Sequence, residues 1–220
     1  ADREGVAAVE DGIVEAATAI RRAIVESRPV VLRHSATVDG YAAAAAIERA
    51  AVPLVRAEHE DTEAEYHYVG RRPLDGRIYG MGDAVRDATN LLDAGERHGE
   101  PVPLFVFVNA GSTTESGDGF ELLSAYGADL VVIDADYPDA EMEAEAEVFL
   151  SPHLAGSGDA ESVSTTALGA NVAAHVSPDA REDVRHLPAV SYWRDAPAVY
   201  RDLAGEAGYD PERIATVREA

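Results

Sequence analysis

The sequence predicts an α/β fold, with a parallel, doubly wound sheet of about five strands flanked by helices and a helical segment at the C-terminal end. Three observations support this prediction. Strand-like and helix-like segments alternate along the first 176 residues. The segments 103–108 and 129–133 are continuously apolar, which is typical of parallel strands buried on both faces. Polar residues follow each expected strand, at the sheet edge where α/β proteins place their ligands.

The first half of the chain opens with a helical pattern. Val6, Val9, Ile13, Ile20 and Ile24 recur at the spacing of one helix face. The expected elements are, in order, a helix at 4–27, a strand at 30–34, a helix at 40–51 that stops at Pro53, a polar edge strand at 64–70, a loop at 71–82 with room for a short strand at 77–79, and a helix at 83–98.

The second half continues the alternation and then becomes helical. The expected elements are strands at 103–108, 129–133 and 148–150, a turn at 109–113, a loop at 151–159, helices at 120–126, 139–146 and 161–176, and two or three further helical segments. We therefore divide the chain into an N-terminal helix at 1–28, an α/β domain at 29–177, and a helical C-terminal extension at 178–220 that packs on the same domain.

The charge of the chain is strongly negative. It has 41 acidic and 18 basic residues, a formal net charge of −23, and no lysine. Because the acids are spread along the whole chain, we favour adaptation to a salt-rich cytoplasm over the alternative of an acidic module for a basic partner. Without cysteine the chain forms no disulfide. It shows no signal peptide and no apolar run near the ~18–20 residues of a membrane span.

Polar side chains follow four expected strands and should converge at one edge of the sheet. They include Asp39, Asn109, Asp134, Asp136 and His153. Asp134 is the strongest candidate for function, because a carboxylate that follows a buried strand has to leave the core. The others have structural alternatives: Asp39 and Asp136 could cap the helices that follow them, Asn109 suits a turn, and His153 could be an ordinary loop histidine.

Four motifs in this order resemble the DHH phosphoesterase superfamily, in its RecJ-like archaeal branch. The family's first motif, His-His-Ala-Asp-Ala-Asp-Gly, corresponds to His-Ser-Ala-Thr-Val-Asp-Gly at 34–40. Its second motif, an Asp before a Gly-Ser turn, corresponds to 109–112. Its third, Asp-His-His-x-Pro, corresponds to Asp-Ala-Asp-Tyr-Pro at 134–138, and its fourth, Asn-Pro-His, to Ser-Pro-His at 151–153. Asp195 could match a further family aspartate. The resemblance implies a DHH-type domain.

This sequence departs from the family where the family binds metal. The resemblance implies two Mn²⁺ or Mg²⁺ ions held by six side chains. The corresponding positions here hold Ser35, Thr37, Asp39, Asn109, Asp134 and Ala135. Two carboxylates remain, and neutral Ser, Thr and Asn are weak ligands for hard divalent ions. Asp39 and Asp134 are therefore vestigial metal ligands, Mn²⁺ or Mg²⁺ is the cofactor if any site survives, and Asp136 and His153 are the remaining catalytic candidates.

The loss of ligands within a retained framework of motifs favours a pseudoenzyme. We expect a degenerate RecJ-like domain that acts as a scaffold or binding module in DNA replication or repair, with a replisome or repair protein as partner. A eukaryotic replisome subunit resembles such a disabled RecJ. The first alternative is an active Mn²⁺- or Mg²⁺-dependent phosphoesterase or single-strand exonuclease that uses Asp39, Asp134 and Asp136 with His34 and His153. The second is a sensor that binds a nucleotide without cleaving it.

One local cluster could bind single-stranded nucleic acid, which requires cations and stacking aromatic rings. It comprises Arg71, Arg72, Arg77, Tyr66, Tyr68 and Tyr79. We favour the alternative of a surface loop whose arginines form salt bridges with nearby acids. The turn around Ser112 could hold an anion, although it lacks the Gly-Lys-Ser/Thr of a phosphate-binding loop.

Overall fold

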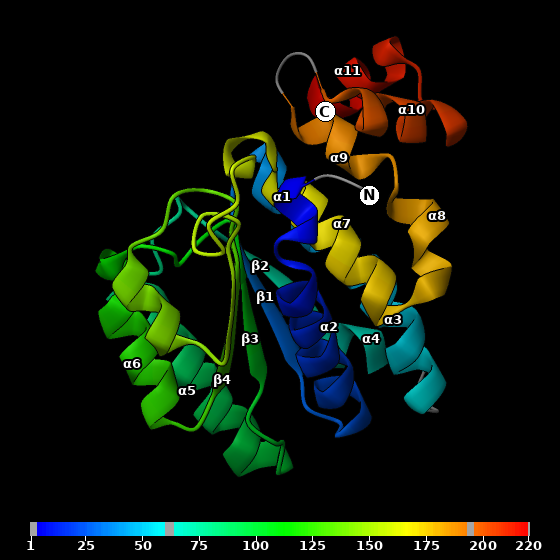
Figure 1. Ribbon diagram of the computed structural model, residues 1–220. Coiled ribbons are helices and arrows are strands. Elements are labelled where there is room, and N and C mark those ends of the chain that lie inside the picture. The colour runs from blue at the N-terminus through cyan, green and yellow to red at the C-terminus, as the bar shows by residue number, and fades with distance from the viewer. Residues whose placement is uncertain (1–3, 60–63, 193–195, 220) are drawn as a thin grey trace.

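The fold is a five-stranded, fully parallel sheet in the order β2-β1-β3-β4-β5 (Figure 1). The computed structural model describes residues 4–59, 64–192 and 196–219. The strands are β1 (Val30–Ser35), β2 (Val69–Leu74), β3 (Leu104–Val108), β4 (Asp129–Ile133) and β5 (Val148–Leu150). All four neighbouring pairs are parallel, so the predicted α/β class is confirmed.

Helices cover both faces of the sheet, as a doubly wound fold requires (Figure 1). On one face α5 (Met81–His98) and α6 (Gly117–Ala125) pack against Phe105 and Phe107 of β3. The other face carries α2 (Glu10–Val25), α3 (Val38–Glu58) and α7 (Thr165–Val176), whose apolar side chains enclose Leu32 and Val106. The shorter elements are α1 (Glu4–Ala7), α4 (Ala64–Tyr68), η1 (Thr114–Ser116), η2 (Ala140–Glu145) and η3 (Ala160–Ser162).

The last part of the described chain is helical and shares the core of the sheet domain. It contains η4 (Pro178–Ala180), α8 (Arg181–Val184), α9 (Leu187–Ser191), α10 (Ala198–Glu206) and α11 (Pro211–Glu219). Val184, Leu187, Tyr200 and Ala204 are buried in the same cluster as the side chains of α2, α3 and α7. No helix among the described residues is long and apolar enough to cross a membrane.

Three features predicted from the sequence are wrong. The strand expected at 64–70 is the short helix α4 followed by β2, because the edge strand buries only Val69 and Leu74 and so lacks a clear apolar pattern. No strand forms at 77–79. The helix expected to stop at Pro53 continues to Glu58, because Pro53 is exposed while Val55, in the next half-turn, is fully buried in the core.

Small residues bring α3 and α7 close together beside the carboxyl edge of the sheet. A Cβ atom at Gly169 of α7 would lie 2.9 Å from the Cβ of Ala43 and 3.0 Å from its carbonyl oxygen. A Cβ at Gly40 would lie 2.8 Å from the carbonyl oxygen of Ser35, at the end of β1. These contacts leave no room for side chains, and they fix the first turns of α3 and α7 beside the end of β1.

A buried histidine in the C-terminal helices should make folding stability depend on pH. The ring of His186 stacks on Tyr209 at 4.0 Å, and burial, with smaller effects from Arg49 and Arg213, lowers the pKa of His186. The unfolded chain therefore binds this proton more tightly than the folded chain, so stability falls as the pH drops below about 6.5. His186→Phe keeps a ring that can stack on Tyr209 but does not titrate. When the buffer is changed from mildly alkaline to mildly acidic, the melting temperature of this variant should therefore fall less than that of the wild type.

Exposed His98 provides the control for this experiment. His98→Phe should follow the wild-type pH dependence, since its ring does not stack on a buried partner. Equal losses in all three proteins would show that His186 does not contribute to the acid response.

Candidate functional site

Loops that follow neighbouring strands meet at the carboxyl edge of the sheet, and Asn109 links them. The Oδ1 atom of Asn109 accepts hydrogen bonds from Ser35 Oγ at 2.7 Å and from Thr37 Oγ1 at 2.9 Å. Its Nδ2 atom donates to Asp136 Oδ2 and to Thr165 Oγ1, both at 3.1 Å. Asn109 has a φ of 54°, in the left-handed region that asparagine tolerates better than most residues. One amide thus connects the ends of β1, β3 and β4 to α7.

Asp134 is almost completely buried, at 1% exposure, and its carboxylate has several partners. Oδ2 accepts a hydrogen bond from Ser112 Oγ at 2.7 Å, and Oδ1 accepts one from the backbone N–H of Asp136 at 3.0 Å. Burial raises the pKa of the Asp134 carboxyl, and the hydrogen bond from Ser112 and the positive charge of Arg77 oppose that rise. Ser112 therefore contacts a carboxylate of the protein itself, and not an open anion site.

Arg77 supplies positive charge to the two carboxylates that follow β4. Its Nη2 atom forms an ion pair with Oδ2 of Asp136 and lies 3.6 Å from Oδ1 of Asp134. The Arg77 and Asp136 side chains are about half exposed, so this pair lies at the mouth of the site, above buried Asp134.

Asp39 caps α7, so the prediction that it could cap the helix directly after it is wrong. Thr37 caps α3, since its Oγ1 accepts the hydrogen bond from the backbone N–H of Gly40. The Asp39 carboxylate instead accepts hydrogen bonds from the backbone N–H groups of Thr165 at 2.9 Å and Thr166 at 2.8 Å, in the first turn of α7. The hydroxyl of Thr166 adds a third hydrogen bond at 2.6 Å. The carboxylate also lies where the helix dipole favours negative charge.

The two histidines proposed for catalysis lie outside this network. His34 is 1% exposed, hydrogen-bonds through Nδ1 to the carbonyl oxygen of Ser35, and has its ring against Tyr41. Burial lowers the pKa of His34, which favours the neutral ring. His153 packs against the ring of Tyr137 at 5.0 Å, beside an open pocket of about 540 Å³. Within the described chain, neither histidine hydrogen-bonds to Asp134 or Asp136.

The side chains at this edge do not fit a centre of two divalent ions. In residues 4–59, 64–192 and 196–219, no group of three or more acidic or histidine side chains is placed to hold a metal. Both oxygens of Asp39 and both oxygens of Asp134 already accept hydrogen bonds from the protein. Ala135 offers no ligand and is buried in the core. Asp195 lies outside the described residues.

The side chains of the three arginines proposed for nucleic acid binding lie in three different places. Arg71 and Arg72 are neighbours on β2 and face opposite sides of the sheet: Arg71 pairs with Glu48 of α3, and Arg72 with Asp87 of α5. Arg77 lies at the candidate site. Tyr79 is fully buried and donates a hydrogen bond to Asp87, so its ring is not available to stack on a base. The contacts of these arginines thus match the alternative in which they form salt bridges with nearby acids.

Sequence reasoning missed two groups of residues. Thr165 and Thr166 join Asp39 and Asn109 to α7, and the Ser-Thr-Thr run at 164–166 before an apolar helix is a signal for a helix N-terminus. Arg33 is 5% exposed and pairs with Asp83 and Asp87, on the face opposite α3. A charged residue inside an otherwise apolar strand is the sequence feature that could have pointed to a buried ion pair at Arg33.

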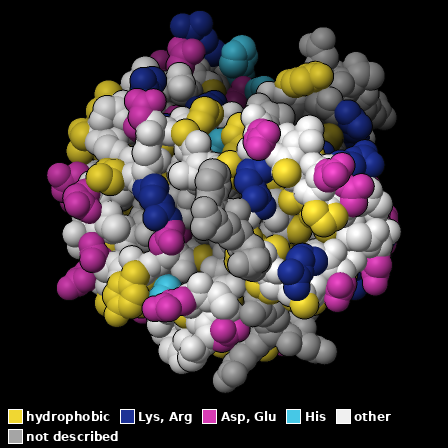
Figure 2. All heavy atoms as spheres, turned by 90° about the horizontal axis from the view of Figure 1, so that it is seen from above, with side chains coloured by type: hydrophobic (Ala, Val, Ile, Leu, Met, Phe, Trp, Pro, Cys, Tyr) yellow, Lys and Arg dark blue, Asp and Glu magenta, His cyan; other side chains and the backbone are white. Residues whose placement is uncertain are grey.

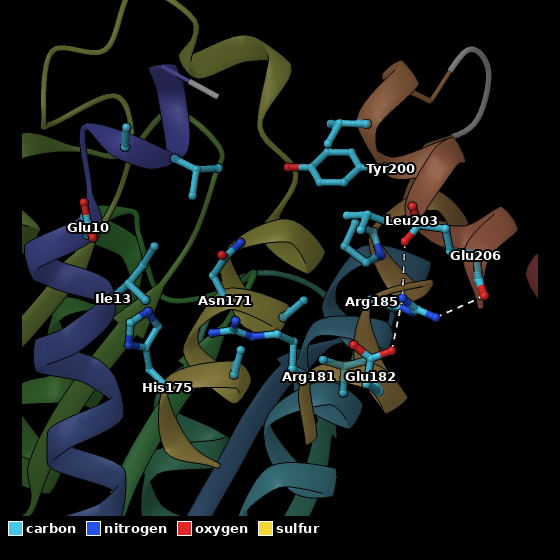
Figure 3. A pocket seen from close by; sticks show the side chains of 17 residues that line it. Glu10, Ile13, Asn171, His175, Arg181, Glu182, Arg185, Tyr200, Leu203 and Glu206 are labelled. Atoms are coloured by element: carbon cyan, nitrogen blue, oxygen red, sulfur yellow. Dashed lines mark hydrogen bonds and ion pairs between the residues drawn. The ribbon is translucent and has the colours of Figure 1, made fainter. Parts of the chain in front are cut away.

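A second pocket lies away from these residues. It has a volume of about 600 Å³ and is lined by α1, α2, α7, α8, α9 and α10 (Figure 3). Arg185 at its side is bridged to Glu182 at 3.1 Å and Glu206 at 3.3 Å, so these charges are compensated within the lining. The pocket contains none of the residues singled out from the sequence as site candidates.

Comparisons with known proteins support the same fold. No family model matches the chain. An uncharacterized protein of Methanocaldococcus jannaschii, MJ1198, is 29% identical over 185 residues, which are 81% of this chain and 24% of that protein. The exonuclease RecJ bound to manganese superposes with a TM-score of 0.61 at 18% identity, over 89% of this chain and 47% of that one. RecJ of Thermus thermophilus in complex with Mn²⁺ gives 0.61 at 17% identity, over 89% and 26% of the two chains.

A more similar structure is the DHH domain of PF0399, which is described as a member of a family of ribosomal proteins. It is 33% identical, with a TM-score of 0.93, over 99% of this chain. This chain spans about half of that solved chain, 52%, and about a quarter of MJ1198. Together with the topology, this similarity shows that the chain has the fold of a DHH domain, and RecJ has a similar fold.

Proposed function

We propose that this domain has no hydrolase activity and serves as a scaffold or binding module in DNA replication or repair. The observation that carries the proposal is the hydrogen-bonding of Asn109. Its side-chain oxygen accepts hydrogen bonds from the hydroxyl groups of Ser35 at 2.7 Å and Thr37 at 2.9 Å. These three residues occupy positions at which the family resemblance implies metal ligands, and here they bond to one another. The fold is retained while the metal-binding groups are replaced by a neutral network.

In two-metal hydrolysis the ligands must carry enough negative charge to hold two cations ~3.5–4 Å apart, and the cations activate a water molecule between them. Two of the six implied ligand positions keep a carboxylate, Asp39 and Asp134, and both carboxylates stabilise the protein itself. The Asp39 side chain accepts hydrogen bonds at the start of α7, so recruiting it to a metal would leave backbone N–H groups of that helix without an acceptor. The side chains at these positions are therefore unsuited to binding a catalytic pair of metal ions.

The proposal is tested by hydrolysis assays with manganese in high salt, on single-stranded DNA, short oligonucleotides and a generic phosphodiester. We expect no turnover above that of Asp134→Ala, because the wild-type network offers no place for the metals. Asp139→Ala is the matched control, since Asp139 is a surface carboxylate bound to Thr114 near the same edge. Turnover that is lost in Asp134→Ala and kept in Asp139→Ala would contradict the proposal and establish a phosphoesterase.

Nucleotide binding without cleavage is a second candidate, favoured by one observation. Tyr137 follows Asp136, is 81% exposed, and packs against His153 beside the 540 Å³ pocket. An exposed aromatic ring of this kind can stack on a base. Calorimetry with mono- and dinucleotides separates the two candidates, since a pure scaffold binds neither.

The proposed environment is a salt-rich cytoplasm, and the proposed partner is a replication or repair protein. Seen from above, acidic side chains are spread over the surface with arginines between them (Figure 2). A net charge of −23 repels nucleic acid at low salt, and screening at high salt removes this repulsion. Single-stranded nucleic acid is therefore a secondary ligand to be tested at high salt.

A further inference from the structure

The segment that carries Arg77 is held firmly over the candidate site. The backbone N–H of Gly111, in the loop after β3, donates a hydrogen bond to the carbonyl oxygen of Arg77 at 2.9 Å. Two residues on, the backbone N–H of Tyr79 donates to Ser116 Oγ at 3.0 Å, and the Tyr79 ring is fully buried. A Cβ at Gly119 would lie 2.7 Å from the carbonyl oxygen of Tyr79, so α6 packs directly on this segment. Arg77 therefore extends from an anchored backbone.

The Arg77 guanidinium reaches the place where two carboxylates come together. Oδ1 of Asp134 and Oδ2 of Asp136 lie 3.4 and 3.1 Å from the same atom, Nδ2 of Asn109. Nη2 of Arg77 contacts these same two oxygens. Two negative charges thus face one amide dipole and one full positive charge. Without the guanidinium, the pair would keep only neutral hydrogen-bond donors.

We infer that Arg77 is the resident cation of this site: it compensates the charges of Asp134 and Asp136 and excludes divalent metal ions from them. The inference rests on the proposed function, which treats the site as metal-free, and adds the residue responsible. A cation tethered to the chain has an effective concentration in the millimolar range or above, so a free ion has to displace it. A pair of carboxylates without a third charged ligand binds divalent ions weakly, so the tethered guanidinium outcompetes the metal ion for these oxygens.

The test is Mn²⁺ binding, measured by calorimetry and by the loss of the free-ion electron paramagnetic resonance signal. Arg77→Gln removes the charge and should bind one Mn²⁺ with a Kd of about 0.1–1 mM, whereas the wild type should bind none in this range. Arg77→Lys keeps a cation and should stay free of Mn²⁺. Arg86→Gln is the matched control, because Arg86 pairs with Asp83 on α5, outside the site, at 2.7 Å. Circular dichroism and thermal melting establish that each variant is folded.

A second variant is needed in case the site of Arg77→Gln binds Mn²⁺ too weakly to be detected. Asn109→Asp combined with Arg77→Gln adds a third carboxylate and should tighten Mn²⁺ binding about tenfold or more. If both variants fold and neither binds Mn²⁺, or if Arg86→Gln binds it equally well, the role of Arg77 is wrong while the proposed function stands. Mn²⁺ binding by the wild type at the same site would overturn both.

Discussion

Replacing Asp87 with Ala should lower the free energy of unfolding by about 3 kcal/mol, because buried Arg33 loses one of its two acidic partners and the buried Tyr79 hydroxyl loses its acceptor. Asp87 is 3% exposed on the inner face of α5. Its carboxylate accepts hydrogen bonds from Tyr79 Oη at 2.9 Å and from Arg72 Nη1 at 3.1 Å. Nε of Arg33, itself 5% exposed, lies 3.2 Å from Oδ2. Asp83 also pairs with Arg33, but Tyr79 would have no acceptor.

Urea denaturation of Asp87→Ala and the wild type gives this difference. Asp93→Ala is the matched control, since Asp93 lies on the same helix, is about half exposed, and pairs with exposed Arg97. It should cost no more than about 1 kcal/mol, as is usual for surface ion pairs. If Asp87→Ala were as mild as Asp93→Ala, the buried pairing of Arg33 would contribute little to the fold.

Replacing Asp39 with Ala should cost about 2–3 kcal/mol, because charge-assisted hydrogen bonds to the first turn of α7 are lost. The carboxylate accepts from the N–H groups of Thr165 and Thr166 and from the Thr166 hydroxyl. Asn at this position keeps one acceptor oxygen, so Asp39→Asn should cost less than Asp39→Ala. This order follows from a capping role, in which an oxygen acceptor matters more than a full charge.

Chemical denaturation of the two variants, without added metal, tests the capping role. Asp118→Ala, at an exposed residue in the first turn of α6, controls for the removal of a single acidic charge. If Asp39→Ala were as stable as the wild type without metal, Asp39 would not be a cap, and its interpretation as a vestigial metal ligand would have to be revised.

The sequence predicts the class of fold from the apolar runs of β3 and β4, since central parallel strands have a strong compositional signal. It misplaces β2, because an edge strand that carries Arg71 and Arg72 has no such signal. Apolar periodicity therefore identifies buried elements and fails where burial is partial.

The same limit applies to the candidate site. The ends of the strands indicate which polar residues come close, and the resemblance to the DHH family indicates which of them differ from its motifs. Local signals do not show that Asp39 caps α7, a helix 126 positions further along the chain, or that Arg77 pairs with Asp136. Those partners are set by the packing of α3 against α7 and by the anchoring of Tyr79, which are tertiary contacts between segments distant in sequence.

The most direct test of the central claim, that this edge of the sheet is a closed hydrogen-bond network and not a metal centre, is a crystal of the wild-type domain soaked in Mn²⁺ and measured for anomalous scattering. We expect no anomalous peak beside Asp39 or Asp134, with Asn109 still hydrogen-bonded to Ser35 and Thr37. Two peaks about 3.5–4 Å apart at these carboxylates would contradict it and would identify a working two-metal phosphoesterase site.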